Sequence, residues 1–396
     1  METAQQTAAL DPEPAADDNQ PAGTAQQQTT VVAIVPAGPR YLAPRRKKAR
    51  HMRRPLPGFV LRVLAVLLVT LFLLLFAVYG VMYVLARGPS PTARRLFVMS
   101  VRETSAVRFL ADWFCTPEEI AGIEGSGGDS LETGDTDVSL IQVGAFGGQA
   151  PDGGAAEGSG LVDEDGDGII LENLSGPGYL GYMMVVLDPA RICLGTLPAF
   201  GGDGLTLSRM VARYDCIAGI NGGGFDDPGG MGDGGVPIGM TVVDGEVLFA
   251  EEGVSYSFAG FDGDCILHTG QMTPQEAREK NIRFGCSFGP VLVSNGEPVS
   301  SSVLLSGVNP RTAIGQRADG AVLLLVIEGR QARSIGATFE DLSDIMLRYG
   351  AVNAYNLDGG SSSNMWFDGE YIGNSASLIG DRAIPTAFLV KKEARE

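Results

Sequence analysis

The residues best suited to chemistry follow an apolar stretch late in the chain. Residues 349–355 are largely apolar and lead through Asn356 to Asp358, which is followed by two glycines and three serines. A strand that ends at Asp-Gly-Gly leaves its carboxylate at a strand end, where a ligand can come close to the backbone. Polar residues gathered at the ends of buried strands are typical of ligand sites. An ordinary Asp-Gly turn before a serine-rich loop explains this segment equally well.

Three more polar clusters lie next to predicted strands. Residues 221–224 (Asn-Gly-Gly-Gly) follow an apolar stretch, and their backbone N–H groups could bind an anion. Arg311 and Thr312 begin one predicted strand, while Glu328 and Arg330 follow the end of the next. Arginine offers a planar pair of donors that suits phosphate. A flexible glycine loop and surface salt bridges are the purely structural alternatives.

Histidine is too scarce for several enzyme classes. The chain has two histidines, His51 and His268, and no cysteine cluster at metal-ligand spacing. A zinc hydrolase would need several such ligands, and a Ser-His-Asp triad would depend on His268 alone. The sequence therefore assigns any chemistry to carboxylates, arginines, hydroxyls and backbone amides.

One acidic segment begins like a calcium-binding loop. Asp163, Asp165 and Asp167 have the Asp-x-Asp-x-Asp-Gly spacing of an EF-hand, but Leu174 stands where the loop needs its closing glutamate. An acidic turn before a strand is the favoured interpretation. A structural Ca²⁺ at these three residues is the only metal that the sequence suggests, and no cofactor is expected to be required.

A long uncharged segment predicts a membrane span. Residues 63–86 carry no charge, and at about 1.5 Å per residue such a helix exceeds the roughly 30 Å of a hydrocarbon core. Nine arginines and lysines precede it between residues 40 and 62, whereas three arginines follow it closely. The positive-inside rule therefore predicts a single-pass protein of the cell membrane, with a cytoplasmic amino terminus and an extracellular carboxyl-terminal part.

The charge and the cysteines constrain the outer part further. The chain has a net charge of −18, but residues 1–95 are net positive, so the remainder is strongly acidic. Such a surface repels nucleic acid, and we expect no nucleic-acid partner. Five cysteines lie after the apolar segment. Cys193 with Cys216, or Cys265 with Cys286, could form disulfides; buried free thiols are an equally good interpretation.

Composition divides the chain into five parts. Residues 1–57 are predicted to be a disordered basic cytoplasmic tail, 58–87 a transmembrane helix and 88–124 a juxtamembrane helical stalk, which could also mediate a homodimer. Residues 125–160 have the glycine- and aspartate-rich composition of a linker, and residues 161–396 form one domain.

Within this domain the patterns predict an α/β (α+β) fold. Four Asp-Gly or Asn-Gly pairs, at residues 244, 295, 319 and 368, separate short apolar stretches and predict hairpins. Residues 205–214 and 338–348 have helical spacing. Further strands are expected over 182–187, 192–194, 216–220 and 384–390. Many hairpins with a few packing helices imply a mixed, largely antiparallel sheet.

Taken together, the clusters resemble a known family. The order Asn-Gly-Gly, Arg-Thr-Ala-Ile-Gly, Gly-Arg and Asn-Leu-Asp-Gly-Gly, over about residues 178–390, is similar to that of the phosphodiester glycosidases, and we expect the bacterial exported, exopolysaccharide-associated branch. The resemblance implies cleavage of the glycosidic bond of a sugar-1-phosphodiester. The site residues that it implies are Asn221, Arg311, Thr312, Arg330, Asp358 and Ser362. Glu328 and Ser361 depart from the family pattern.

The chemistry expected of these residues is coherent. Arg311 and Arg330 would bind the phosphodiester, and Asp358 would act as nucleophile or base with Glu328 as its partner. Gly222 and Asn356 are assigned to substrate binding. The predicted function is a membrane-anchored extracellular glycosidase acting on envelope or exopolysaccharide glycans. The alternatives are a non-catalytic module that binds glycan or phosphate, and a calcium-dependent phosphodiesterase that cuts the P–O bond.

Overall fold

A computed structural model describes most of the chain after the predicted tail. The described residues are 58–104, 107–125, 135–143, 161–163, 165–228, 232–300, 304, 306–377 and 380–392. The predicted cytoplasmic tail, residues 1–57, and residues 144–160 of the predicted linker lie outside these ranges. The chain divides into residues 1–65, of which only the start of helix α1 (Gly58–Arg87) is described, and residues 66–396.

Helix α1 confirms the long apolar helix expected over residues 58–87. Its 30 residues correspond to about 45 Å, and its apolar side chains are exposed along its length; Phe72, for example, is 66% exposed. It is long and apolar enough to cross a membrane. A soluble core helix would bury one face, so the exposure on every side is what a lipid-facing helix requires.

Three short helices follow α1. They are α2 (Pro91–Arg102), α3 (Phe109–Phe114) and α4 (Pro117–Gly125). The Ser90 side chain caps α2 with proline at its first position, and Thr116 and Glu119 exchange hydrogen bonds at the start of α4. The apolar residues of the three helices pack on one another and on Met82 and Ala86 of α1. The expected helical region over 88–124 is thus a small helical cluster.

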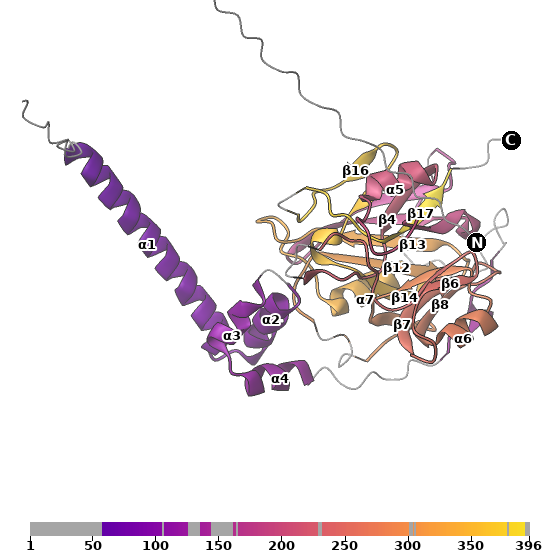
Figure 1. The fold of residues 1–396 in the computed structure, drawn as a ribbon, viewed down its shortest axis with the longest axis horizontal. Helices are drawn as coiled ribbons and strands as arrows, with labels where there is room; N and C mark the ends of the chain where they lie inside the picture. Colours follow the sequence, from indigo (N-terminus) through magenta and orange to yellow (C-terminus); the bar gives the residue numbers. More distant parts are fainter. Residues whose placement is uncertain are drawn as a thin grey trace, which may run out of the picture. The chain divides into compact units, whose positions relative to one another are not determined.

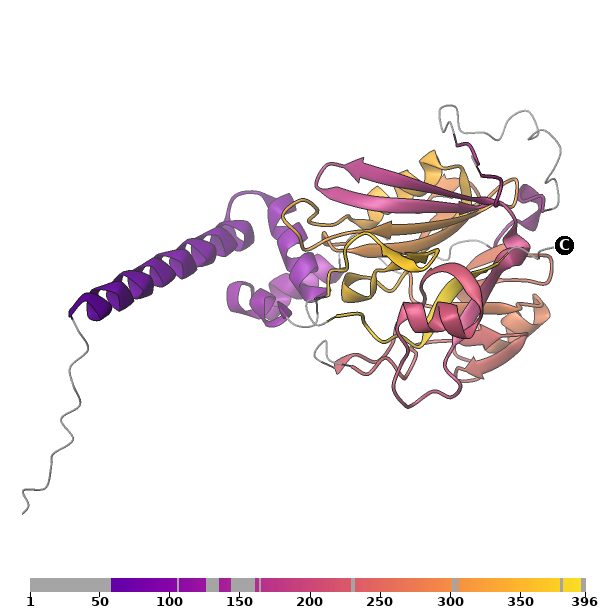
Figure 2. The ribbon, with the colours of Figure 1, turned by 90° about the horizontal axis from the view of Figure 1, so that it is seen from above.

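The largest sheet has seven strands, all paired antiparallel (Figures 1 and 2). Its order is β1 (Ile169–Gly176), β2 (Tyr179–Val186), β13 (Val322–Ile327), β12 (Arg311–Arg317), β14 (Ala351–Leu357), β10 (Val291–Ser294) and β11 (Glu297–Pro298). Figure 2 shows the long β1–β2 hairpin, in magenta, running beside the orange strands of the same sheet.

The register of this sheet gathers the polar strand ends. Arg311 pairs with Ile327, the last residue of β13, and Thr312 pairs with Leu357, the last residue of β14. Because β12 is antiparallel to both neighbours, its first residues lie beside the last residues of β13 and β14. The polar residues that the sequence placed at these termini therefore meet at one end of the sheet.

Two five-stranded sheets complete the domain. One has the order β16 (Glu370–Ile372), β15 (Met365–Phe367), β4 (Cys216–Asn221), β17 (Thr386–Lys391) and β3 (Ile192–Thr196). The other has the order β6 (Glu246–Phe249), β5 (Thr241–Val243), β9 (Phe284–Ser287), β7 (Tyr256–Phe261) and β8 (Leu267–Met272). All of their pairings are antiparallel, so the α+β class is confirmed, with three sheets in place of one.

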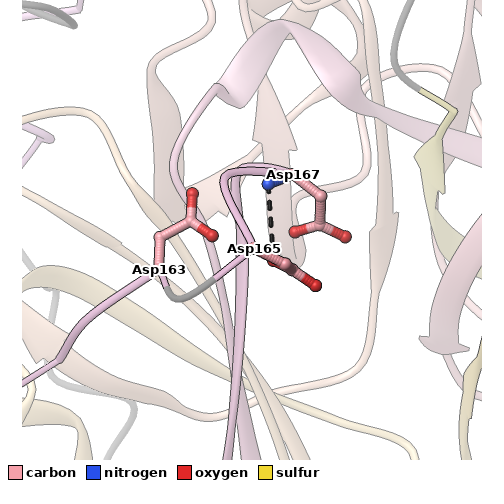
Figure 3. Close-up of side chains that lie close together, drawn as sticks. All are labelled: Asp163, Asp165 and Asp167. Atoms are coloured by element: carbon pink, nitrogen blue, oxygen red, sulfur yellow. Dashed lines mark hydrogen bonds between the residues drawn. The ribbon is translucent and has the colours of Figure 1, made fainter.

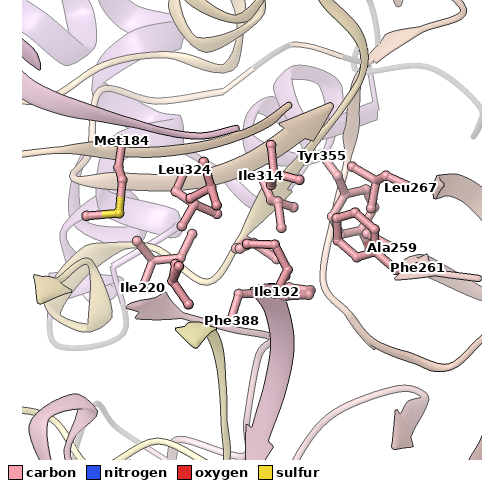
Figure 4. Close-up of a cluster of buried hydrophobic side chains, with 14 of the residues drawn as sticks. Met184, Ile192, Ile220, Ala259, Phe261, Leu267, Ile314, Leu324, Tyr355 and Phe388 are labelled. Carbon is pink, nitrogen blue, oxygen red and sulfur yellow. The ribbon is translucent and has the colours of Figure 1, made fainter. Parts of the chain in front are cut away.

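The core lies where the three sheets meet. Figure 4 shows Ile314 and Leu324 of the large sheet facing Ile220 and Phe388 of the second sheet, and Phe261 of the third belongs to the same buried cluster. Helix α7 (Phe339–Arg348) packs on β10 and β14, and α5 (Leu207–Arg213) packs on β4 and β17 (Figure 1). Helix α6 (Pro274–Glu279) adds Ala277 to a smaller cluster. Burial of this apolar surface fixes the strand ends that carry the site.

All four predicted hairpin turns are present. The first residue of each of three pairs has a positive φ, at Asp244, Asn295 and Asp368, and each is followed by a glycine with positive φ. These are the left-handed conformations that the sharp hairpin turns need. The fourth pair, Asp319-Gly320, joins β12 to β13 with positive φ at the glycine only. The helices expected at 205–214 and 338–348 also form, as α5 and α7.

Part of the segment expected to be a linker packs on the domain. Ile141 is buried, and the Asn295 side chain exchanges hydrogen bonds with the backbone of Asp135 and Asp137. The Thr136 hydroxyl accepts a hydrogen bond from the backbone of Thr269. Residues 135–143 therefore lie against the domain surface.

Candidate active site

Asp358 follows the last residue of β14 and is held on both sides. Its backbone N–H donates to the carbonyl of Gly222 (3.1 Å), and its carbonyl accepts from Asn221 Nδ2 (2.7 Å). The carboxylate accepts hydrogen bonds from the Gly359 N–H and the Ser362 hydroxyl. Burial is the main influence on this group and raises the pKa of Asp358 to about 6, against the lowering effect of these two donors. A carboxyl group with this pKa can exchange a proton near neutral pH.

Asn221 fastens the second sheet to the strand ends of the large one. It is completely buried, and its Oδ1 accepts hydrogen bonds from the Thr312 hydroxyl (2.7 Å) and the Asn364 N–H (3.2 Å). With its bond to Asp358, it joins three segments of the chain. Asn221 and Thr312 therefore hold the backbone of the site in place through buried hydrogen bonds, since buried polar atoms need partners.

The glycines after Asn221 contribute close packing. The N–H groups of Gly222 and Gly223 donate to the carbonyl and hydroxyl of Thr386, and that of Gly224 donates to the Ser287 carbonyl. A side chain on Gly222 would come within 2.6 Å of the Thr386 hydroxyl. Because these N–H groups already have acceptors within the protein, they do not form the anion site that the sequence suggested. The glycines instead allow two sheets to pack closely.

Arg330 brings a positive charge to the carboxylate. It adopts a left-handed conformation, with φ of 58°, which is strained for arginine and is typical of functional sites. Its Nη2 would lie 3.1 Å from a side chain on Gly360, so a glycine with positive φ is required there. Desolvation and the neighbouring Arg311 lower the pKa of Arg330, whereas Glu103 and Asp358 raise it. Arg330 remains exposed and can reach a ligand.

Arg311, by contrast, is buried and already paired. Its guanidinium donates to the carbonyls of Ala337 (3.2 Å) and Gly307 (2.7 Å) and to the Glu103 carboxylate (2.6 Å). The same group stacks 4.2 Å from the centre of the Phe339 ring. Burial lowers the pKa of Arg311, and the Glu103 carboxylate opposes that shift. Arg311 is therefore a supporting residue with its donors largely occupied.

Glu103, at the end of α2, is the residue that sequence reasoning missed. It accepts hydrogen bonds from the Gly307 N–H (2.8 Å) and from Asn309 Nδ2 (2.9 Å), besides its ion pair with Arg311. The neighbouring Thr104 hydroxyl contacts Asn309 Oδ1 (3.3 Å) and accepts from Arg330 (2.8 Å). Residues 103 and 104 thus touch both arginines. About 200 residues separate them from their partners, and no local pattern signals such a contact.

Glu328 lies apart from Asp358. Its carboxylate is 3% exposed and accepts hydrogen bonds from the Tyr182 hydroxyl (3.1 Å), the Asn374 backbone (2.8 Å) and Arg333 (3.2 Å). Among the described residues no hydrogen bond or ion pair joins it to Asp358. The structure therefore places Glu328 in a separate network that fixes the chain after β16.

A second arginine, Arg382, acts on the charge of Asp358. Arg382, 6% exposed, forms an ion pair with Asp227 (2.8 Å) and stacks on the Phe225 ring at 5.3 Å. The Asp227 carboxylate raises the pKa of Asp358, and the Arg382 guanidinium lowers it, so both lie close to this carboxyl group. Neither stands in a motif that the sequence singled out. Arg330 and Arg382 thus both interact electrostatically with Asp358.

The remaining predicted residues line this region unequally. Ser362 is 4% exposed and bonded to Asp358, as its position four residues later suggests. Asn356 donates to the Gly289 carbonyl (2.7 Å), while its own Oδ1 is buried and has no hydrogen-bond partner. The hydroxyl of Ser363 is likewise buried and unpaired. Both unpaired atoms are buried, so neither is open to a ligand in this structure.

The acidic loop, for which a calcium site was the less favoured prediction, brings three carboxylates close to one another (Figure 3). Carboxylate oxygens of Asp163, Asp165 and Asp167 lie within 4.8 Å of one another. Both oxygens of Asp163 accept backbone N–H groups, from Gly166 (2.9 Å) and Gly168 (3.0 Å). Burial raises the pKa of Asp167, and the charges of the other two aspartates add to this effect. The donor set of hard carboxylate oxygens suits Ca²⁺.

The other titratable candidates have structural partners. His268 is 6% exposed, and its Nε2 lies 2.8 Å from the Asp262 carboxylate, away from the Asp358 cluster in sequence and sheet. The five cysteines are free thiols. Cys193 and Cys216, one of the two pairs that the sequence offered, lie next to each other, because an interaction between the two thiols lowers the pKa of Cys193 and raises that of Cys216.

Comparison with known proteins finds one family that is similar to the part of the chain with the site. Residues 214–391 match the phosphodiester glycosidase family. The chain is 32% identical, over 213 residues, to the SPbeta prophage-derived uncharacterized protein YomE of Bacillus subtilis, which covers 50% of this chain and 30% of that protein. It is 26% identical to the human N-acetylglucosamine-1-phosphodiester alpha-N-acetylglucosaminidase over 214 residues, 48% of this chain and 40% of the human protein.

Solved structures give weaker likenesses. The catalytic domain of the zebrafish N-acetylglucosamine-1-phosphodiester alpha-N-acetylglucosaminidase is 20% identical, with a TM-score of 0.48, over 57% of this chain and 82% of that one. A putative exported protein of Burkholderia pseudomallei is 18% identical, with a TM-score of 0.42, over 54% and 74%.

The match covers the part of the chain that carries the candidate site. The chain spans less than half the length of the relatives that it matches in sequence. Asn221, Arg311, Arg330 and Asp358 all fall within the matched residues, whereas Glu103 lies outside them. Residues 214–391, which carry the candidate site, are therefore the part of this chain that is similar to the phosphodiester glycosidases.

Proposed function

We propose that this protein is a membrane-anchored glycosidase that hydrolyses the glycosidic bond of a sugar-1-phosphodiester in a glycan outside the cell. The observation that carries this proposal is Asp358, a carboxyl group with a raised pKa that interacts electrostatically with two arginines, in the part of the chain that matches the family. The apolar helix α1 and the positive charges before it support the anchored, outward-facing arrangement.

The residues divide the chemistry between them. Arg330 is exposed near Asp358 and binds the phosphodiester anion, and Arg382 is a second guanidinium near the same carboxylate. As the C–O bond breaks, negative charge gathers on the departing phosphate, and fixed guanidinium groups stabilise it. A phosphate monoester is a good leaving group, so strong acid assistance is unnecessary. Asp358 acts on the sugar carbon as nucleophile, or removes a proton from the attacking water.

Glu103 is a positioning residue in this scheme. It neutralises the buried Arg311 and orients Asn309, whose Oδ1 in turn accepts a hydrogen bond from Arg330 (3.3 Å). Arg311 therefore acts through its neighbours, and Arg330 is the guanidinium that meets substrate. This division revises the expectation that both arginines bind the phosphodiester.

The experiment follows the position of the broken bond. The full-length protein in detergent is incubated with a chromogenic sugar-1-phosphodiester in water enriched in ¹⁸O. Cleavage of the glycosidic bond places the label on the free sugar and leaves an unlabelled phosphomonoester. Label on phosphate would identify a P–O phosphodiesterase, and sensitivity to EDTA would identify a calcium-dependent one. Binding of the phosphodiester without turnover would identify a non-catalytic module. Label on phosphate, or binding without turnover, would overturn the proposal.

A further inference from the structure

We propose that helix α3 lies on the outer surface of the membrane, with Phe109 and Trp113 among the lipid headgroups beside the end of α1. The two side chains are exposed on one face of the helix, Trp113 by 71% and Phe109 by 47%. Their rings meet edge to face at 5.0 Å. The opposite face, Ala111 and Phe114, is buried. This inference rests on the proposed membrane anchoring by α1 and not on the proposed reaction.

The height of α3 along α1 is fixed by side-chain contacts. The Phe114 ring lies 5.4 Å from that of Tyr79, and Tyr79 stacks along the helix on Tyr83 at 6.4 Å. Tyr79 stands eight residues before Arg87, which ends α1, and therefore about 12 Å below it. Met82 and Ala86 pack with Phe114 in one apolar cluster. Helix α3 is thus level with the last two turns of α1.

Ion pairs hold this arrangement in place. The Glu119 carboxylate of α4 forms ion pairs with Arg87 (2.8 Å), at the end of α1, and with Arg94 (2.6 Å), in α2. The Glu119 carboxylate keeps a pKa of about 2, chiefly because of its hydrogen bond with the Thr116 backbone and its contact with Arg94. It stays charged at any physiological pH, so the helices remain clamped to the end of α1.

The apolar surface of α1 continues to Ala86, so this level is the boundary between hydrocarbon and headgroups. Tryptophan and tyrosine are enriched at that boundary, because their rings are apolar on one side and polar on the other. Arg108 is exposed next to Phe109 and suits lipid phosphate. Tyr79, Tyr83 and the α3 pair together form the aromatic belt expected of a membrane protein.

Lipid fits this surface better than a second copy of the chain. Fully burying two aromatic side chains removes roughly 300–500 Å² of surface from water, whereas a stable protein interface needs about 800 Å² from each partner. Contact with a bilayer beside α1 requires no minimum buried area, because α1 already anchors the chain. We therefore expect the exposed face of α3 to contact the membrane interface. This contact would hold the helical cluster close to the membrane, together with the domain, whose Arg311 forms an ion pair with Glu103.

The chain offers a direct test because it contains only two tryptophans, Trp113 and Trp366. The full-length Trp366→Phe protein, reconstituted in phosphatidylcholine vesicles, reports on Trp113 alone. Lipids brominated at shallow acyl positions should quench its fluorescence strongly, and acrylamide in the water should quench it weakly. The matched Trp113→Phe protein reports on Trp366, which packs on Tyr371 in the domain, and bromolipids should leave it unchanged.

Two results would overturn the inference. Quenching of Trp113 by acrylamide and not by bromolipid would place α3 in water, and protection from both would place it in a protein interface such as a dimer. Extraction with alkaline carbonate tests the membrane span of α1 independently of the α3 contact. Release of the protein from the vesicles would disprove the span. A protein that stays in the vesicles but shows no quenching of Trp113 by bromolipid would disprove only the α3 contact. Unchanged thermal unfolding of Trp366→Phe confirms that the reporter protein is folded.

Discussion

Asp358 and the acidic loop at residues 163–167 are both aspartates in glycine-containing turns, yet their surroundings differ completely. The Asp358 carboxylate is desolvated and lies near Arg330 and Arg382, which come from distant parts of the chain. The Asp163 carboxylate bonds to the backbone of its own loop, at Gly166 and Gly168. One acid depends on the fold for its environment, and the other is arranged locally.

The difference shows why only one of them has the character of a reacting group. A carboxylate that is desolvated without full compensation keeps a raised pKa and an incomplete set of partners, which a substrate can supply. In the acidic loop the Asp163 carboxylate accepts two backbone N–H groups, and three carboxylates close together attract a cation. Replacing residues at each position tests this contrast.

The largest effect is expected for Asp358→Asn. Loss of the nucleophile or base should reduce kcat by at least about 10³-fold, because both roles need the ionised carboxylate. The matched control is Asp165→Asn, in the exposed loop, which should keep full activity. Steady-state turnover of the chromogenic phosphodiester measures both. Activity of Asp358→Asn close to that of the unmodified protein would remove Asp358 from the chemistry.

The next effect concerns the residue that supports the arginines. Glu103→Gln leaves the buried Arg311 without its counter-charge and should lower the free energy of unfolding by about 2–4 kcal/mol. If Glu103 also orients Asn309 and Arg330, KM for the phosphodiester should rise several-fold at a temperature where the variant is folded. Calorimetry and kinetics separate the two effects.

Comparison variants sharpen this prediction. Glu103→Asp keeps the charge and should recover much of the KM, whereas Ser100→Ala removes only the contact with the Val308 backbone (2.8 Å) and should leave KM unchanged. A gain of activity in Glu103→Gln would show instead that the carboxylate blocks the site.

The pH dependence of the reaction should follow Asp358. If the ionised carboxylate reacts, kcat/KM should fall tenfold per pH unit below about pH 6 and reach a plateau above it. The Ser362 hydroxyl bonds to the carboxylate and lowers its pKa, so Ser362→Ala should shift this limb to higher pH. Rates from pH 4.5 to 8 measure the shift, and a limb that stays in place would remove Ser362 as a donor to Asp358.

The stability of the folded protein should also depend on Asp358, but it should decrease as the pH rises, whereas the activity should increase. The pKa of Asp358 in the folded protein, about 6, is above the ordinary value of 3.8, so the folded state holds this proton more tightly than the unfolded chain. The free energy of unfolding therefore declines as the pH rises from about 4 to about 6. Asp358→Asn removes the decline and should be more stable above pH 6, by roughly 1–2 kcal/mol after allowance for solvent screening.

Hairpins and helices were predictable because their signals are local. The Asp-Gly and Asn-Gly turns lie between the strands expected, with positive φ where the turn requires it. Strands β7, β8 and β9 were missed in part because glycines interrupt their apolar pattern. A side chain on Gly285 would approach the Ala259 carbonyl to 2.4 Å, so these strands need small residues where the pattern calls for large ones.

The site was predictable to the extent that strand ends specify it. Asp358, Arg330 and Ser362 come together because β12 is antiparallel to β13 and β14. The roles of Arg311 and Glu328 could not be predicted, because a sequence motif gives residue types but does not show which hydrogen-bonding groups already have partners. Glu103, Asp227 and Arg382 reach the site across long stretches of chain, and only the packing of the sheets and the helical cluster brings them there.

The smallest effect is expected at the acidic loop. Extracellular calcium sites of this kind have dissociation constants of about 10⁻⁴–10⁻³ M, so 10 mM Ca²⁺ adds roughly 1.4 kcal/mol at the weak end of this range. That corresponds to a rise of about 3–6 °C in Tm for a domain of this size. Mg²⁺ at the same concentration should give less, and Asp165→Asn should abolish the rise while leaving turnover unchanged. Equal shifts in the variant would show that the three carboxylates bind no ion, and that their arrangement serves the turn alone.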